Sequence, residues 1–155
     1  MSIALGCDEA GFYLKEELKK YIQGIGETVA DYGVYNTEPV LYPDIAVHVA
    51  TEIAQGKCER GILICGTGIG MAIAANKVPG IRAAVCHDPY SAERARKSNN
   101  AQIMAIGAKV IDAELAKNLV QLWLVSEFAG GGSLEKVNRI SAYEEKFLKG
   151  CLKES

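Results

Sequence analysis

The segment Gly61-Ile62-Leu63-Ile64-Cys65 runs directly into Gly66-Thr67-Gly68-Ile69-Gly70, and this stretch of ten residues carries the clearest information about the fold. Its first half is the most apolar strand-like segment of the chain, and a short apolar run of this kind is typical of a strand buried on both faces of a parallel sheet. Its second half is rich in glycine, so the backbone can turn sharply, and the small residues from Met71 to Asn76 then predict a helix. We therefore expect a central strand that ends at Cys65 and turns tightly into a helix.

Outward from this stretch, strand-like and helix-like segments alternate from one end of the chain to the other. Short apolar runs predict four more strands, at Ile3 to Cys7, Thr28 to Tyr32, Arg82 to Cys86 and Ile103 to Ile106. Apolar residues at helical spacing predict further helices at Gly11 to Ile22, Pro43 to about Gln55, Pro89 to about Lys97, Ala113 to Phe128 and about Leu134 to Leu148. This order predicts an α/β fold in a single domain, residues 1–155, with a doubly wound, five-stranded parallel sheet.

The last predicted helix is set apart by the glycine run Gly130-Gly131-Gly132. The sequence leaves two places open for this helix. It packs either on a partner subunit or back on its own sheet.

Composition and charge exclude several classes of protein. The chain has 155 residues, a formal net charge of −2 and a pI near 5.7, which argues against nucleic acid or an anionic membrane as its main partner. No apolar run approaches the ~20 residues of a membrane helix. The first residues lack the basic region of a secretory signal and predict a strand, so we expect a cytoplasmic protein.

The five cysteines and two histidines predict reduced thiols and no structural metal site. The cysteine count is odd, and no pair has the Cys-x-x-Cys spacing of a zinc site. Most of the cysteines fit the role of small buried apolar residues. Only the local surroundings can mark one of them as reactive.

In a parallel α/β sheet the ligand lies beyond the carboxyl ends of the strands. This rule selects four segments as the candidate site: Cys7-Asp8-Glu9, the stretch from Cys65 to Gly70, Cys86-His87-Asp88 and the loop after Ile106.

Cys65 and the glycines after it are the strongest local feature. Several N–H groups at the start of a helix can surround one anion, either a phosphate or an oxygen that becomes negative during a reaction. The same glycines also fit a tight turn that requires small residues, without any ligand. A thiol beside a helix N-terminus is expected to have a pKa below its usual ~8.5, so Cys65 is a candidate nucleophile or base.

The neighbouring polar residues each have two interpretations. Asp8 can reach a ligand or cap the helix that follows it. Glu9 adds negative charge that repels an anionic substrate unless it is paired. Tyr42 lies before a helix start and fits either packing or the site. His87 is the one histidine at a strand end, whereas His48 lies among apolar residues of a helix and fits packing or surface exposure.

Taken together, several segments closely resemble the ribose-5-phosphate isomerase B family, which includes the subunits of galactose-6-phosphate isomerase. The resemblance covers nearly the whole chain in collinear order. It is carried by Gly6-Cys7-Asp8-x-x-Gly11, Tyr42-Pro43-Asp44, the stretch from Gly61 to Gly70, Ala74-Ala75-Asn76-Lys77, Gly80-Ile81-Arg82-Ala83, Pro89-Tyr90-Ser91-Ala92 and Glu114-Leu115-Ala116-Lys117.

The resemblance implies a Rossmann-like fold and a homodimer, or a dimer of dimers, with active sites shared at the subunit interface. It implies a sugar phosphate as the partner of the site and no metal or organic cofactor. The family activity is an aldose–ketose isomerisation in carbohydrate metabolism, of the type that interconverts ribose 5-phosphate and ribulose 5-phosphate in the pentose phosphate reactions.

The resemblance also implies roles for individual residues. Cys65 would take the proton from the carbon next to the carbonyl, and the amides of Gly66, Gly68, Ile69 and Gly70 would hold the enediolate oxygen. Asp8 would orient substrate hydroxyls. The other implied positions are Thr67 for ring opening, Asn99 entering from the neighbouring subunit, and Tyr42 lining the site.

The chain departs from the family pattern where the substrate is recognised. Glu9 and Ser98 stand where many members have histidine, and the histidine at the second position opens the sugar ring. The phosphate segment usually carries two arginines, and Gly132 and Lys136 occupy the aligned positions, with Lys109 at a further position that is often arginine. An ammonium group cannot replace the two-pronged guanidinium contact to a phosphate.

These departures leave several hypotheses open. One is a tetrose phosphate such as erythrose or erythrulose 4-phosphate, which cannot close the usual ring. Another is a pentose or hexose phosphate whose ring is opened by Thr67, Ser98 or His87. Lys109, Lys136 and Arg139 are candidates for the anion, or are solvated surface charges.

Two hypotheses come from other functional classes. The chain could be a binding module that lost catalysis. It could also be a Cys65–His87 hydrolase, which requires the two side chains within hydrogen-bond reach.

Overall fold

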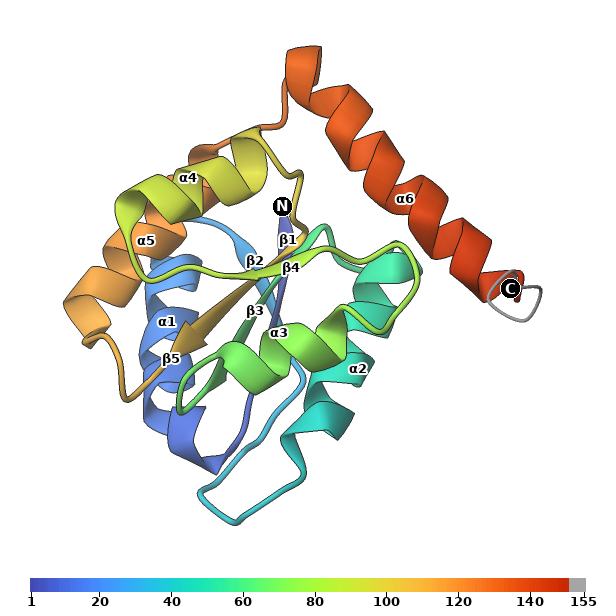
Figure 1. The fold of residues 1–155 in the computed structure, drawn as a ribbon. Coiled ribbons are helices and arrows are strands. Elements are labelled where there is room, and N and C mark those ends of the chain that lie inside the picture. Colours follow the sequence, from blue (N-terminus) through green and yellow to red (C-terminus); the bar gives the residue numbers. More distant parts are fainter. Residues whose placement is uncertain (151–155) are drawn as a thin grey trace.

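The computed structural model describes residues 1–150 and contains a five-stranded parallel sheet (Figure 1). Across the sheet the order is β2 (Thr28–Asp31), β1 (Ser2–Cys7), β3 (Arg60–Cys65), β5 (Ile103–Gly107) and β4 (Ala83–Val85). All four strand pairs are parallel. The predicted fold class is confirmed, and β3 lies at the centre of the sheet with all six of its residues buried.

The helices follow the strands in the predicted order. They are α1 (Phe12–Gly24), α2 (Tyr42–Ala54), α3 (Ile69–Ala75), α4 (Pro89–Lys97), α5 (Ala113–Val125) and α6 (Leu134–Leu148). Two short 3-10 turns, η1 (Glu9–Gly11) and η2 (Gly131–Ser133), precede α1 and α6. Within residues 1–150, no helix has the length and apolar character needed to cross a membrane.

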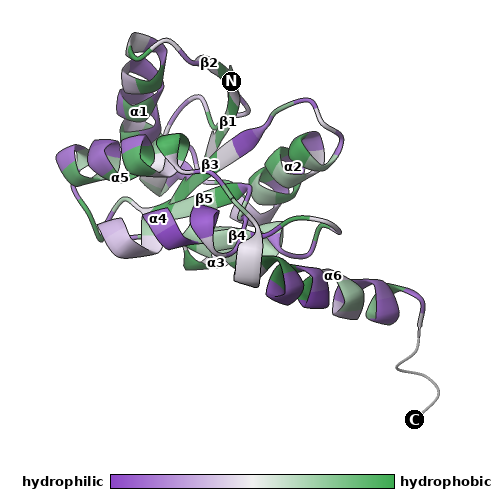
Figure 2. Cartoon of the chain, turned by 90° about the horizontal axis from the view of Figure 1, so that it is seen from above, coloured by the Kyte–Doolittle hydropathy of each residue, from purple (hydrophilic) through white to green (hydrophobic). Residues whose placement is uncertain are grey.

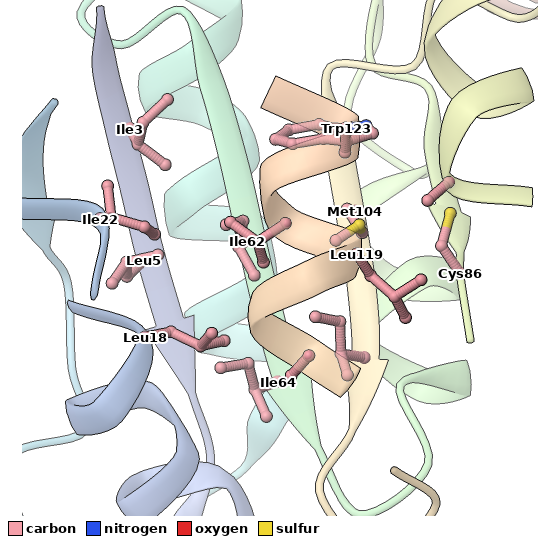
Figure 3. Close-up of a cluster of buried hydrophobic side chains, with 14 of the residues drawn as sticks. Ile3, Leu5, Leu18, Ile22, Ile62, Ile64, Cys86, Met104, Leu119 and Trp123 are labelled. Atoms are coloured by element: carbon pink, nitrogen blue, oxygen red, sulfur yellow. The ribbon is translucent and has the colours of Figure 1, made fainter. Parts of the chain in front are cut away.

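The sheet is covered on both faces, which produces two apolar layers. On one face, α1, α4 and α5 pack against Ile3, Leu5, Ile62 and Met104, and the indole of Trp123 closes this layer (Figure 3). On the other face, α2 and α3 cover a thinner layer around Leu63, Ala105 and Cys65. Burial on both faces explains why the residues of β3 are apolar without alternation.

Helix α6 stands away from the sheet, as Figures 1 and 2 show. Val137 is its one buried side chain among the described residues, and Glu144 accepts a hydrogen bond from Gly80 N–H at 3.0 Å. The helix exposes a set of large apolar side chains: Leu134, Ile140, Tyr143, Phe147 and Leu148. The alternative in which this helix folds back on its own sheet is therefore wrong, and packing on a partner subunit stays a prediction.

Helix α5 ends at Val125, so the predicted end at Phe128 is wrong. Arg60 Nη1 donates to the carbonyl oxygens of Trp123 and Leu124 at 2.9 and 2.8 Å. Ser126 is extended, with φ −85° and ψ 135°. The final carbonyls are thus satisfied by a side chain from β3, which stops the helix one turn before its apolar pattern ends.

Candidate active site

The carboxyl ends of β1, β3 and β5 meet at one edge of the sheet. Cys65 at the end of β3 lies in register with Gly107 at the end of β5, and Asp8 N–H donates to Ile64 O at 3.1 Å. Ala108 N–H donates to Cys65 O at 2.8 Å. The structure therefore brings together the segments that the strand-end rule selected.

Cys65 lies under the glycine turn, and its side chain is 6% exposed. Its sulfur accepts a hydrogen bond from Gly68 N–H at 3.1 Å. Gly68 has φ +78°, and a Cβ there would lie 2.9 Å from the backbone carbon of Ile106. Only glycine fits that backbone and that contact, so the turn holds an N–H donor directly on the sulfur.

The amides of the turn are partly used by the protein itself. Gly68 N–H donates to the sulfur of Cys65, and Ile69 N–H donates to Thr67 Oγ1 at 3.2 Å. Two of these amides therefore already have acceptors within the chain, and their contact with a ligand stays a prediction. An oxyanion would have to replace Cys65 or Thr67 to use these two donors. Thr67 is exposed, and because its oxygen accepts from Ile69 its hydroxyl proton remains available for donation.

Tyr42 reaches the turn from the first residue of α2. Its hydroxyl oxygen is 2.4 Å from the position that a Cβ on Gly70 would occupy. The side chain is 38% exposed, so part of the phenol faces solvent beside the turn. The structure therefore brings Tyr42 to the glycine turn, and its role in lining the site stays a prediction.

Asp8 is 8% exposed and caps the η1 turn, since its Oδ1 accepts from Gly11 N–H at 3.1 Å. Burial raises the pKa of this carboxyl, and the backbone donors only partly oppose the rise. Glu9 Oε2 accepts from Val40 N–H at 3.2 Å. Glu9 thus holds the loop that leads into Tyr42, which explains how its negative charge is accommodated near the site.

His87 follows β4 and lies on the other side of Gly107 from Cys65. Its Nε2 accepts a hydrogen bond from Gly107 N–H at 2.8 Å, and burial lowers the pKa of the imidazole. Among the described residues, His87 and Cys65 make hydrogen bonds to backbone amides and none to each other. The geometry required by the Cys65–His87 hydrolysis hypothesis is absent from this part of the chain.

The candidate cations are spread over two regions. Lys109 lies beside the turn, with its N–H donating to Gly66 O at 3.1 Å and its side-chain Cδ 3.6 Å from a Cβ placed on Gly66. Lys136 and Arg139 are exposed on α6, which stands off the sheet, and Gly132 lies in η2. Of these three candidate cations, only Lys109 lies near Cys65 within a single chain.

Ser98 and Asn99 lie at the opposite edge of the sheet from Cys65. They follow the last residue of α4, and a helix that connects parallel strands ends near the amino ends of those strands. Arg94 Nη1 donates to Ser98 Oγ at 3.3 Å, and Asn99 is exposed. One chain therefore does not assemble all the predicted site residues.

Sequence reasoning missed two features near the site. Gly107 packs on Thr67, where a Cβ would lie 2.7 Å from the Thr67 backbone, and the only signal for it was its place at a strand end. Lys15 is fully buried and pairs with Asp31 at 2.8 Å below the loop held by Glu9. No sequence signal distinguished Lys15 from the other lysines of α1.

The structure also shows where His48 and the described cysteines lie. His48 is exposed on α2 and lies edge-on to Tyr32, with ring centroids 4.9 Å apart. Cys7, Cys58, Cys65 and Cys86 are free thiols, and Cys151 lies outside the described residues. Residues 1–150 contain no group of three side chains suited to hold a metal ion.

Comparison with known proteins gives consistent matches over almost the whole chain. Residues 3–140 match the family described as Ribose/Galactose Isomerase. The chain is 56% identical to D-erythrulose-4-phosphate isomerase of Pectobacterium atrosepticum, over 94% of this chain and 97% of the relative. It is 44% identical to ribose-5-phosphate isomerase B of Escherichia coli, over 93% and 97% of the two chains.

Solved structures give the same result. The Clostridium thermocellum ribose-5-phosphate isomerase B structure superposes with a TM-score of 0.93 at 45% identity, covering 95% of this chain and 99% of that one. The Mycoplasma genitalium ribose-5-phosphate isomerase B structure with bound ribulose 5-phosphate has a TM-score of 0.89 at 31% identity, covering 94% and 97%.

Proposed function

Because this chain belongs to the ribose/galactose isomerase family and is an aldose–ketose isomerase of sugar phosphates, we propose that its substrate is a tetrose phosphate, interconverted between the erythrose and erythrulose 4-phosphate forms. Because the matched family is one of isomerases, the alternative of a non-catalytic binding module is dropped. The four-carbon substrate rests on one observation, the serine at position 98.

Ser98 stands where the family resemblance places a ring-opening histidine. Its hydroxyl accepts a hydrogen bond from Arg94, and a serine hydroxyl does not act as a base near neutral pH without a neighbouring base. A tetrose 4-phosphate carries its phosphate on the oxygen that would close a five-membered ring. Such a substrate stays open and needs no ring-opening base. Two relatives, from Pectobacterium atrosepticum and Mycolicibacterium smegmatis, are named D-erythrulose-4-phosphate isomerases.

Cys65 is the proposed base. Its thiolate takes the proton from the carbon beside the carbonyl, and the resulting negative charge moves to the carbonyl oxygen. The N–H groups of the turn from Gly66 to Gly70 are the donors for that oxygen. The hydrogen bond from Gly68 to the sulfur supports this role, because the same donor can serve the sulfur before the reaction and the oxygen during it.

Substrate contacts are proposed for the polar residues around the turn. Thr67 keeps a free hydroxyl proton to donate, and Tyr42 borders the turn at Gly70. Asp8, with a pKa raised by burial, orients substrate hydroxyls, while Glu9 acts through the loop it holds. Lys109 and Lys136 bind the phosphate, Lys109 from beside Gly66.

We propose a homodimer, or a dimer of dimers, in which Ser98 and Asn99 of one subunit complete the site of the other. The support is geometric, since these two residues lie at the edge of the sheet opposite Cys65 in their own chain. The exposed apolar residues of α6 are the proposed contact with the partner, and this contact also brings Lys136 toward a site.

The test is turnover of four-, five- and six-carbon aldose and ketose phosphates by the same preparation. We expect tetrose phosphates to be converted and ribose 5-phosphate to be converted negligibly. The reverse ratio would contradict the four-carbon proposal and favour ribose 5-phosphate. The Listeria innocua and Escherichia coli relatives, at 53% and 44% identity, are the observation that keeps this second candidate open.

The role of Cys65 is tested separately with Cys65→Ala. We expect loss of solvent-deuterium incorporation at the reacting carbon, while substrate binding measured by calorimetry remains. Cys58→Ala is the matched control, because Cys58 is also buried but precedes β3 at the other edge of the sheet. Full activity in Cys65→Ala would refute the cysteine mechanism without affecting the family assignment.

A further inference from the structure

His87 makes an unusual contact at the end of the sheet. Strand β4 ends at Val85, which pairs with Ala105, and Cys86 N–H donates to Ala105 O at 3.1 Å. The next outward amide of β5, Gly107 N–H, has no β4 residue opposite it. The imidazole of His87 takes that place, with Nε2 accepting at 2.8 Å.

This contact fixes the protonation state and the tautomer of the imidazole ring. A nitrogen that accepts from an amide N–H carries no proton itself, so the one proton of the neutral imidazole is on Nδ1. An imidazolium has no acceptor and would face the Gly107 N–H with a second N–H. Burial opposes the charged form in addition, because it lowers the pKa of His87. Asp88 favours the charged form, but its carboxylate is held by Ser91 N–H and Oγ at 2.8 and 2.7 Å.

The protonated nitrogen is free to act on a ligand. Among the described residues, Nδ1 has no hydrogen-bond partner. The buried side-chain nitrogen and oxygen atoms left without a partner are Arg94 Nε and Trp123 Nε1. Nδ1 of His87 is not one of them, so it is open to solvent at the carboxyl edge of the sheet.

His87 lies near enough to Cys65 for both to act on one small molecule. Gly107 is in register with Cys65 and is also the residue bonded to His87. Strands β3 and β4 are two strand spacings apart, about 10 Å, which side chains on both sides of a substrate can bridge. Val85 packs in the same apolar layer as Cys65, and Cys86 in the opposite one. His87 itself lies beyond the end of β4, and its bond to Gly107 N–H holds the ring at the carboxyl end of β5, the strand beside that of Cys65.

We propose that His87 is the neutral acid–base group that moves the proton between the two substrate oxygens, while Cys65 moves the proton between the two carbons. This inference rests on the proposed isomerisation at Cys65 and deepens it. The chemistry requires such a group, because an aldose becomes a ketose only if a hydroxyl proton is also transferred between neighbouring oxygens.

The steps balance in atoms and charge. The Cys65 thiolate removes the C–H proton of the aldose, and the negative charge moves to the carbonyl oxygen beside the amides of the turn. His87 Nδ1–H then gives its proton to that oxygen, and an enediol forms. The imidazolate left on His87 then takes the proton of the neighbouring hydroxyl, and that oxygen becomes the new carbonyl. The Cys65 thiol returns its proton to the terminal carbon, so both groups end as they began. Neutral imidazoles held by a backbone N–H act in this way as electrophiles in sugar-phosphate isomerisation on another fold.

The first test is the protonation state of the ring in the intact wild-type protein. Nitrogen-15 NMR of protein labelled at histidine contains two imidazoles, because His48 is the only other histidine of the chain. We expect one ring to be neutral at pH 7 with its proton on Nδ1, and to be assigned to His87 by loss of its signals in His87→Gln. A proton on Nε2, or a charged ring at pH 7, would overturn the proposal. This measurement needs no active variant.

The second test separates a chemical role from a structural one. Glutamine can accept from Gly107 N–H and donate to a ligand, but it cannot relay a proton. We expect His87→Gln to lower kcat by about 10²–10⁴-fold with KM within about threefold, since proton transfer by a positioned side chain contributes that much. Exchange of solvent deuterium into the unconverted substrate should rise relative to product formation, because Cys65 continues to remove and return the carbon-bound proton. The control His48→Gln should match wild type.

Unchanged kcat in His87→Gln, or an equal fall in exchange and product formation with a lowered melting temperature, would refute the role of His87. If Cys65→Ala retained activity instead, the proposed mechanism would fail while the NMR result on His87 still stood. The two failures are therefore distinguishable.

Discussion

The hydroxyl of Tyr42 lies against Gly70 so closely that a Cβ atom at position 70 would come within 2.4 Å of it. This contact joins the first residue of α2 to the turn that follows Cys65. The position of the turn therefore depends on a side chain from another helix, and the first prediction tests that dependence.

Gly70→Ala should displace Tyr42 or the turn. We expect a loss of about 1–3 kcal/mol in the free energy of unfolding, as for overpacking elsewhere. We also expect a fall in kcat/KM of about 10²-fold, since small displacements of reacting groups are costly. Gly24→Ala is the matched control, because nothing lies within 4 Å of the added methyl group. Urea unfolding and steady-state kinetics measure both effects, and wild-type values in Gly70→Ala would contradict the prediction.

Mixing two inactive variants tests whether the site is shared between subunits. Cys65→Ala and Asn99→Ala damage opposite edges of one chain, so a mixed dimer contains one site with neither lesion. After unfolding and refolding an equal mixture, we expect about a quarter of wild-type activity, as random pairing in a two-fold dimer gives. No recovery from variants that refold well alone would show that each site belongs to one chain.

Ser98→His should change the choice of substrate. A histidine supplies a base for ring opening, so turnover of ribose 5-phosphate should rise by about 10²-fold, at the lower end of the usual contribution of general acid–base groups. Turnover of tetrose phosphates, which need no ring opening, should change little. Ser98→Gln, of similar size but without a base, is the control. An equal rise in that variant would assign the effect to shape.

Lys15 and Asp31 form a buried ion pair, with the Lys15 amino group fully buried and 2.8 Å from the carboxylate. Burial alone would raise the pKa of Asp31, but donors from Lys15, Gly33 and Lys19 outweigh it and hold the pKa below its usual value. A lowered acid pKa gives stability that is present above about pH 4 and is lost as the pH falls through the folded pKa.

Asp31→Asn should therefore be destabilised at neutral pH by about 1.5–3 kcal/mol, because it removes a charged hydrogen-bond partner of the buried Lys15 and leaves Glu16, 3.1 Å away, as its remaining carboxylate. The difference from wild type should begin to shrink below about pH 4, where the carboxyl of the unfolded chain takes up a proton, and should continue to shrink as the pH falls through the lowered pKa of the folded state. Urea unfolding across pH measures this. The control Glu38→Gln removes an exposed carboxyl of the following loop. A pH-independent difference for Asp31→Asn would contradict the assignment.

Arg60 should contribute more to the free energy of unfolding through its bonds to backbone carbonyls than through its ion pair with Glu127. Arg60→Met removes donors to the last carbonyls of α5, and we expect a loss of at least about 2 kcal/mol, given the value of charged hydrogen bonds. Glu127→Gln removes only the exposed carboxylate partner, 70% exposed, and should cost no more than about 1 kcal/mol. Equal losses in thermal unfolding of the two variants would contradict this difference.

The local sequence predicted those strands, helices and turns that depend on their own pattern of apolar and small residues. The apolar run of β3 and the glycines after Cys65 predicted a buried strand and a sharp turn, and both are present. The end of α5 was not predictable in this way, because it is set by Arg60, which lies more than 60 residues away in the sequence. Asp8 was left between two roles, and only the distance to Gly11 N–H shows that it caps η1.

From the sequence alone we could predict the order of strands and helices along the chain, the edge of the sheet where Cys65, Asp8 and His87 would gather, and the family to which the chain belongs. The first two depend on periodicity and on the strand-end rule, which are properties of neighbouring residues, and the family was indicated by the resemblance of motifs spread along the chain. The three-dimensional structure was needed to show that Lys15 is buried against Asp31, that His87 accepts a hydrogen bond from Gly107, and that Ser98 lies at the edge of the sheet far from Cys65. These relationships join segments whose separation is set by how the helices pack on the sheet, and no local pattern encodes a distance between them.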